Sequence, residues 1–377
     1  MGSLAGKSVF RWLALRAPGP SASVTVCVVL GTLLGTGCQE KFDLATLPQQ
    51  RMQILDTAYV QIYPPLGSFV GPRGILIGRD QLLYVADSAG NSLVMMNRAG
   101  QVLSSRRMLH PLSVGQDSRL DLLVGGEVAT ASGGTAGALF RLHLVSANPD
   151  SAHRLEVAPI DTIWTEYAKP ARRFPGITVL GDNEYLVVRN GVDNSSFIDP
   201  DARVLIFNGK DRFITPLPGL ATVTGTGITN INFPTGIASF PQVRDFVLTQ
   251  TSSGVAYGAI WMTYQQTSDF EGWIPRYDPA NLQDRSTDFI RPNRLSYARA
   301  VAIDPIRRDV FIADAALDSV FKFNSRGALK SETFGFVRSD NAMLRPVGLA
   351  FFENILYVLD GDRGLIIRFR LSTDIPR

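Results

Sequence analysis

The residues that could carry out catalysis are few and widely spaced. The 377-residue chain has three histidines, His110, His143 and His153, and none has the spacing of metal ligands or a cysteine partner. It contains no Gly-x-Ser-x-Gly nucleophile elbow and no Gly-Lys-Ser/Thr phosphate loop. Gly225-Thr226-Gly227 begins a Gly-x-Gly motif but lacks the third glycine, so it indicates a loop. The sequence therefore predicts no cofactor and no catalytic residues.

One group of oxygen ligands could meet around calcium: Asn194, Asp199 and Asp201. Their spacing is not that of an EF-hand loop. A solvated surface loop is the interpretation we favour.

Three arginines stand at or just before the start of an apolar segment: Arg73, Arg299 and Arg345. If they point toward one another they could bind an acidic peptide or a carboxylated ligand, because guanidinium groups bind carboxylates with two hydrogen bonds. An acid recurs at the end of the next apolar segment: Asp87, Asp314 and Asp360. Solvation of the arginines, or pairing with these acids, is the interpretation we favour, because a recurring aspartate at a strand end usually caps a turn.

Aromatic side chains could anchor a partner. Trp164 and Trp273 are candidates for such an interface, and Trp261 is expected in the core because it lies in an apolar segment.

These residues must be positioned by a repeated unit. Near the start, three short apolar segments are separated by turn residues: 74–77, 82–87 and 92–97. Near the end the same pattern returns at 347–351, 355–360 and 365–369. Such a unit cannot bury both of its faces alone, so several units must pack around one axis. The pattern predicts an all-β, six-bladed β-propeller.

Six units are expected, beginning near residues 74, 112, 176, 236, 300 and 348. In the second unit the outer strand is predicted at Leu155–Ile160. In the fourth unit, Pro241–Tyr257 is predicted to be an insertion after the first strand. In the fifth unit the outer strand is predicted at Ala328–Thr333, after an Asn-x-x-Gly turn that suits a tight hairpin.

The sixth unit has no chain left for a fourth strand, whereas the segment Gln53–Tyr63 has no unit of its own. We therefore expect Gln53–Tyr63 to be the outer strand of the last blade, which closes the ring and removes an exposed edge. Most of the longer loops are predicted on the face where the first strands begin, and insertions on one face often mark a binding side.

The first residues are typical of an export signal. Lys7, Arg11 and Arg16 precede an apolar run from Val24 to Leu34, and small residues then lead to Cys38. These three residues also account for the net charge of +3, so the remainder is neutral, which argues against a nucleic-acid-binding face. The expected organisation is a leader at 1–37, a linker at 38–52, the propeller at 53–371 and a tail at 372–377.

Two resemblances follow from these residues. The Pro-x-Gly-Ile and Leu-Tyr-Val-Ala-Asp segments with their closing hairpin resemble the NHL repeat of six-bladed propellers. The leader resembles that of a bacterial lipoprotein, which implies a lipid on Cys38 and, because Gln39 follows it, the outer membrane. An uncleaved N-terminal anchor helix is the alternative.

The function expected from these resemblances is that of a membrane-tethered, periplasm-facing scaffold of the cell envelope that binds a protein partner, as an accessory subunit of a membrane complex. The alternatives are a calcium-dependent hydrolase or lactonase, and a protein that binds glycans or peptides.

Overall fold

The computed structural model describes residues 57–145, 153–196, 198–217, 222–224, 227–229, 233–251, 258–266, 271–275, 294–335 and 343–375. The predicted leader at 1–37, with Cys38 and the linker, lies outside these residues. Within the described part of the chain, no helix is both long and apolar enough to span a bilayer.

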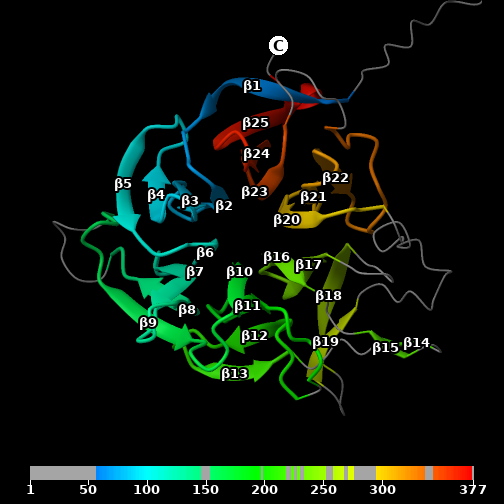
Figure 1. Cartoon of the computed structure of the whole chain (residues 1–377). Coiled ribbons are helices and arrows are strands. Elements are labelled where there is room, and N and C mark those ends of the chain that lie inside the picture. Colours follow the sequence, from blue (N-terminus) through cyan, green and yellow to red (C-terminus); the bar gives the residue numbers. More distant parts are fainter. Residues whose placement is uncertain are drawn as a thin grey trace, which may run out of the picture. The chain divides into compact units, whose positions relative to one another are not determined.

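Six antiparallel sheets surround one axis, as the repeats predict (Figure 1). The first blade contains β2 (Pro72–Ile77), β3 (Leu83–Asp87), β4 (Ser92–Met96) and β5 (Val102–Arg107). The second contains β6 (Ser113–Gln116), β7 (Leu122–Ala129), β8 (Thr135–Leu142) and β9 (Ile160–Thr165). The third contains β10 (Arg173–Val179), β11 (Tyr185–Asn190), β12 (Arg203–Phe207) and β13 (Phe213–Pro216).

The remaining blades follow the same order from the axis outward. The fourth contains β16 (Pro234–Phe240), β17 (Asp245–Gln250), β18 (Ala259–Gln266) and β19 (Glu271–Pro275). The fifth contains β20 (Ala298–Ile303), β21 (Val310–Asp314) and β22 (Ser319–Phe323). The sixth contains β23 (Pro346–Phe352), β24 (Ile355–Asp360), β25 (Leu365–Leu371) and, from the start of the chain, β1 (Tyr59–Leu66). A separate hairpin, β14 (Thr222–Thr224) and β15 (Gly227–Thr229), and a short 3-10 turn, η2 (Ser372–Asp374), complete the described elements.

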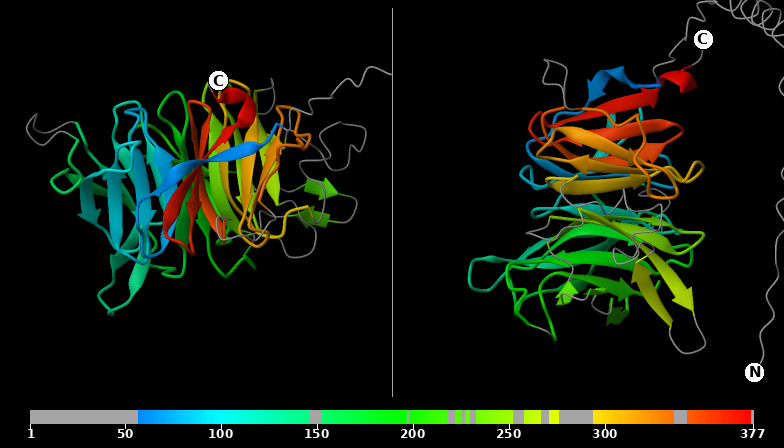
Figure 2. Two further views of the ribbon diagram at one scale, coloured as in Figure 1. Left: turned by 90° about the horizontal axis from the view of Figure 1, so that it is seen from above. Right: turned by 90° about the vertical axis from the view of Figure 1, so that its right-hand side faces the viewer.

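The predicted ring closure is confirmed. β1 pairs antiparallel with β25, with Tyr59 opposite Leu371 and Ile62 opposite Arg368. Both views in Figure 2 show β1 lying along the outer edge of β25. Because the strand begins at Tyr59, it covers only the second half of the predicted range, and residues 53–56 lie outside the described part.

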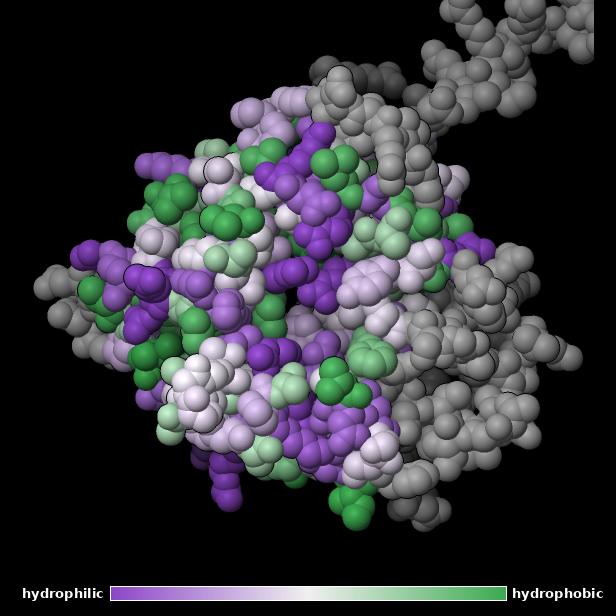
Figure 3. Space-filling model, in the orientation of Figure 1, coloured by the Kyte–Doolittle hydropathy of each residue, from purple (hydrophilic) through white to green (hydrophobic). Residues whose placement is uncertain are grey.

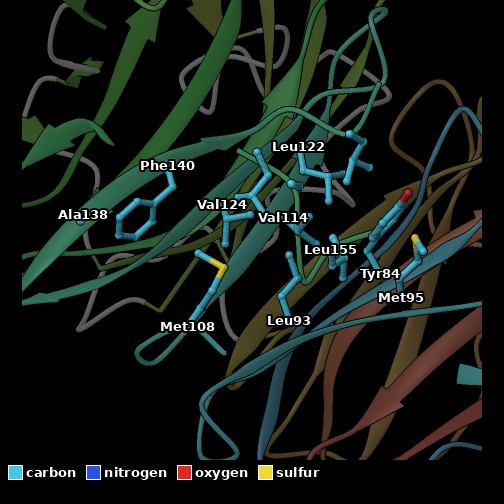
Figure 4. Packing of buried hydrophobic residues seen from close by; sticks show 13 residues of the cluster. Tyr84, Leu93, Met95, Met108, Val114, Leu122, Val124, Ala138, Phe140 and Leu155 are labelled. Atoms are coloured by element: carbon cyan, nitrogen blue, oxygen red, sulfur yellow. The ribbon is translucent and has the colours of Figure 1, made fainter. Parts of the chain in front are cut away.

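Buried apolar residues form six clusters, one between each pair of neighbouring blades. Between the first two blades, Tyr84, Leu93 and Met95 belong to one buried cluster with Val124 and Phe140 (Figure 4). Each blade therefore depends on its neighbours for its core, which is the physical reason that the units close into a ring.

Two predicted outer strands and one predicted insertion are wrong, and each error has a local cause. The outer strand of the second blade is Ile160–Thr165 rather than Leu155–Ile160, because Leu155 lies in a turn in which Ala158 donates to the Arg154 carbonyl. The predicted insertion in the fourth blade contains its second strand, β17, so each later strand moves one place outward. In the fifth blade, a turn at Lys330–Thr333 interrupts the predicted outer strand and leaves two isolated bridges, Phe323–Leu329 and Val320–Phe334.

Candidate functional site

The axis of the propeller is an open channel of about 350 Å³. The first strand of every blade contributes to its wall: β2, β6, β10, β16, β20 and β23. Within the described residues, the charged side chains that line it are all arginines, Arg73 and Arg299 at one end and Arg79 at the other. We call the end where the first strands begin the channel mouth; Figure 3 views this face and shows hydrophilic residues around a central hollow.

Backbone bulges place two of the arginines at the channel mouth. Pro72 pairs with Asp87 and Gly74 with Ala86, so Arg73 is an extra residue in β2. The same irregularity leaves Arg299 between Ala298 and Ala300 in β20. A bulge redirects a side chain out of the regular alternation of a strand, and here the redirected side chains are those of Arg73 and Arg299.

A glycine next to the bulge keeps neighbouring blades close. A Cβ on Gly74 would lie 2.7 Å from the Leu112 carbonyl oxygen, which is too close for any other residue. The first strands therefore approach one another backbone to backbone at the channel mouth.

The three predicted arginines gather at the channel mouth. Burial lowers the pKa of Arg299, and the neighbouring positive charges of Arg73 and Arg345 lower it further, although Tyr297 opposes this. Within the described residues, neither Arg73 nor Arg299 forms an ion pair. Arg345 differs, because its Nε donates to Asp362 Oδ1 at 2.6 Å. The cluster thus carries more positive charge than its surroundings neutralise.

The predicted pairing of these arginines with the recurring aspartates is wrong, whereas the turn-capping role is confirmed. Asp87 accepts hydrogen bonds from the backbone N–H groups of Val70 and Gly71. Asp314 accepts from Ser296 and Tyr297, and Asp360 accepts from Leu344. Each carboxylate also accepts from the following turn, so these acids hold the loops at the channel mouth and are not available to the arginines.

The opposite side of the channel mouth is neutral. The second, third and fourth blades have Ser113, Pro175 and Thr235 where the first and fifth have arginine. The two hydroxyl groups bind backbone carbonyls, Ser113 that of Phe174 at 2.7 Å and Thr235 that of Ala298 at 2.7 Å. Among the described residues, the positive charge at the channel mouth therefore comes from the first, fifth and sixth blades, which carry the clear repeat.

The candidate calcium ligands are engaged elsewhere. Asp199 and Asp201 bind Arg172 at 2.6 and 2.7 Å, and Asn194 Oδ1 accepts from Ala202. The preferred interpretation, a solvated loop, is also wrong for Asp201, which is 2% exposed. No group of three His, Cys, Asp or Glu side chains in the described part of the chain is arranged to hold a metal ion.

The positions of the tryptophans differ from the predicted aromatic interface. Trp273 is wrong as an exposed anchor, because it is 7% exposed and packs edge-on against Phe246 and Tyr264. Trp164 lies in β9 rather than in a loop, and its half-buried ring packs against Phe207 and Phe213. Trp261 is in the core, as predicted, although in the third strand of its blade.

Sequence comparisons identify no relatives. No protein-family model matches the chain, and no curated protein matches it.

Solved structures resemble its fold. A gluconolactonase from Xanthomonas campestris has a TM-score of 0.51 at 11% identity over 83% of this chain and 100% of its own. Regucalcin, a calcium-binding protein from Agrobacterium tumefaciens, has a TM-score of 0.54 at 9% identity over 84% of this chain and 95% of its own. An auxiliary nutrient binding protein from Bacteroides thetaiotaomicron has a TM-score of 0.54 at 11% identity over 84% of this chain and 76% of its own. At these identities the likeness shows a shared six-bladed propeller fold and nothing about activity.

The described lining of the channel does not favour a metal ion. Calcium takes carboxylate and carbonyl oxygens, whereas the described lining contains no aspartate, glutamate or histidine. A divalent cation would also be repelled by Arg73 and Arg299. This donor set does not fit a metal ion, but it does fit an anion.

Proposed function

We propose that this chain is a binding protein that holds a carboxylate-bearing ligand at the channel mouth of its propeller. The observation that carries the proposal is the gathering of three guanidinium groups, two of them without a described carboxylate partner, at the end of an open channel. Like charges at close range destabilise the unliganded protein, and a bound carboxylate relieves that repulsion while accepting charge-assisted hydrogen bonds.

Binding is favoured over catalysis by what surrounds the arginines. None of the three histidines lines the channel; His110 contacts Glu127, and His143 contacts Asp121 and Asp161. A hydrolase would need a general base or a metal-bound water beside the substrate. The described lining offers hydroxyl and guanidinium groups, which orient a ligand without activating a nucleophile.

The binding test uses citrate, tricarballylate and succinate as probes in isothermal titration calorimetry. We expect the wild-type protein to bind the tricarboxylates. The double variant Arg73→Met/Arg299→Met should bind at least tenfold more weakly, or about 1.4 kcal/mol. Arg326→Met is the matched control, because Arg326 is exposed in a turn at the opposite end of its blade. Equal affinities for the wild-type protein and the double variant would refute the proposal.

We further propose that the protein acts in the cell envelope, held at the membrane through a lipid on Cys38, where it presents the channel mouth to a protein partner. The support is the leader alone: basic residues, an apolar run and small residues before Cys38. Replacing Cys38 by Ser should move the protein from the membrane to the soluble fraction. Unchanged membrane association would show that the tether is the leader helix or a partner.

A further inference from the structure

Exposed apolar side chains accompany the arginines at the channel mouth. Val70, Tyr297 and Leu344 lie three, two and one residues before Arg73, Arg299 and Arg345 respectively, and they are 76%, 42% and 40% exposed. The recurring aspartates accept hydrogen bonds from the N–H groups of these same three residues. Each of these three blades thus presents an exposed apolar side chain near an arginine, although the two residues do not hold equivalent positions in the three blades. We call Val70, Tyr297 and Leu344 the apolar rim.

Below the arginines the channel wall is mixed: hydroxyl side chains such as those of Thr178 and Ser239 line it together with aliphatic side chains. One aliphatic residue from each blade stands immediately inside the channel mouth: Ile75, Val114, Ile177, Ile237, Val301 and Leu349. Each is at most 9% exposed. A ligand that enters therefore meets positive charge at the channel mouth, a wall that includes these aliphatic side chains inside it, and exposed apolar side chains on the rim outside.

This order of surfaces matches one kind of ligand. We propose that the channel mouth binds the C-terminal end of a polypeptide, with the terminal carboxylate on Arg73 and Arg299, an aliphatic last side chain in the channel and the preceding residues across the apolar rim. The inference rests on the proposed binding function and names its ligand class. The channel, at about 350 Å³, is at the lower end of the volumes of small-ligand sites, so it holds the end of a chain and not a folded domain.

The rim distinguishes a polypeptide from a small amphiphilic acid. A fatty acid would place its carboxylate on the arginines and its tail in the channel, and would leave Val70 and Leu344 in water. A chain that continues out of the channel mouth covers them, which stabilises the complex through burial of apolar surface. Charge complementarity and the position of the rim both favour the longer ligand.

The probe is a pooled library of N-terminally labelled heptapeptides with the last three positions randomised, prepared as the free acid and as the C-terminal amide. We expect the protein to enrich free acids with Leu, Ile or Val at the last position and to enrich nothing from the amide pool. Amidation removes the terminal charge and one acceptor oxygen, and it needs no variant of the protein. For the best peptide, the amide and the Arg299→Met variant should each weaken binding at least tenfold, whereas Arg326→Met should not change it.

The rim variant Val70→Ser/Leu344→Ser tests recognition of a polypeptide separately from binding of a carboxylate. It keeps both backbone N–H groups, so it should weaken the best peptide about tenfold and leave citrate affinity unchanged. If citrate binds but the acid and amide pools behave alike, the polypeptide inference is wrong and carboxylate binding stands. If dodecanoate binds more tightly than the best peptide and the rim variant has no effect, the ligand is an amphiphile and the inference is also overturned. If neither citrate nor any peptide binds, both the polypeptide inference and the proposed carboxylate-binding function are refuted.

Discussion

Two groups of arginines in this protein differ in how their charge is neutralised. In the third blade, Arg172 and Arg189 are each 4% exposed and share Glu166 and Asp199. These guanidinium groups hold the pKa of Asp199 down to about 2, even though burial raises it. At the channel mouth, by contrast, Arg73 and Arg299 are half-buried and form no ion pair within the described residues.

The contrast shows that the fold does neutralise buried arginines where they serve its own structure. Arg172 and Arg189 link the loop before β10 to the loop between β11 and β12. The chain could have placed an acid beside Arg299 in the same way, but its nearest recurring acid, Asp314, is committed to backbone N–H groups. Charge left without a partner at a concave surface is more easily explained by a ligand than by folding.

The largest effect is expected from breaking the neutralised group. Replacing Arg172 by Met leaves the Asp201 side chain, which is 3% exposed, without its closest charged partner, and leaves the buried Glu166 paired with Arg189 alone. Removing one member of a buried ion pair typically costs roughly 3–5 kcal/mol, and we expect the free energy of unfolding in urea to fall by that amount. Arg326→Met is the surface control. A loss below about 1 kcal/mol would mean that this network adds little to stability and that the contrast is not energetic.

The channel-mouth arginines should behave in the opposite way. We expect Arg73→Met/Arg299→Met to keep or raise the free energy of unfolding, by about 0.5–2 kcal/mol, because the change removes mutual repulsion at a functional site. Citrate should raise the melting temperature of the wild-type protein but not that of the double variant, since a ligand stabilises only the state that binds it. A clear destabilisation of the double variant without citrate would place these arginines in the structural group.

Arg345 is intermediate and sharpens the comparison. Its partner Asp362 is 49% exposed, so Arg345→Met should change stability by no more than about 1 kcal/mol. Asp362→Asn should tighten citrate binding, because it frees the Arg345 guanidinium group for the ligand. Weaker binding by Asp362→Asn would instead show that Asp362 positions Arg345, and calorimetry on both variants distinguishes these results.

Sequence repeats predicted the ring, but only where the repeat is regular. The segments 82–87 and 355–360 are continuous apolar runs that end in aspartate, and both the strands and the turn-capping role follow from that pattern. In the fourth blade, Asp245–Gln250 has the polar ends of a loop and follows a Pro-containing turn, so its sequence predicts an insertion where the structure has a strand. A short strand whose apolar residues are central to a core cannot be distinguished from a loop by local pattern alone.

The sequence predicted the arginines of the candidate site but not their surroundings. Arg73, Arg299 and Arg345 could be identified because each stands at the start of the first strand of its repeat, although Arg345 lies two residues before the position that Arg73 and Arg299 share. Their lack of partners could not, because it depends on the bulges and on which N–H groups the aspartates accept. The apolar rim was missed, although its signal was present in the sequence as an apolar residue one to three positions before each arginine.

The smallest expected effect concerns a pH-dependent contact beside a third neutralised arginine, Arg141, which binds Asp117 and Asp211. His143 lies between Asp121, at 3.1 Å from Nδ1, and Asp161, at 3.0 Å from Nε2. Burial lowers the pKa of His143, but the two carboxylates outweigh it, so the folded-state pKa is raised.

A raised pKa means that the protonated histidine stabilises the fold. This contribution is complete below the unfolded value of about 6.5 and is lost as pH rises through the folded-state pKa. The wild-type protein should therefore lose more unfolding free energy than His143→Gln between pH 6 and pH 8.5, as measured by urea midpoints. Arg141 and Arg119 already share Asp121 and limit the effect, and the 74% exposure of Asp161 weakens it further. Parallel pH profiles for the two proteins would show that the carboxylates are held by the arginines alone, and that histidine protonation adds nothing to the neutralised group.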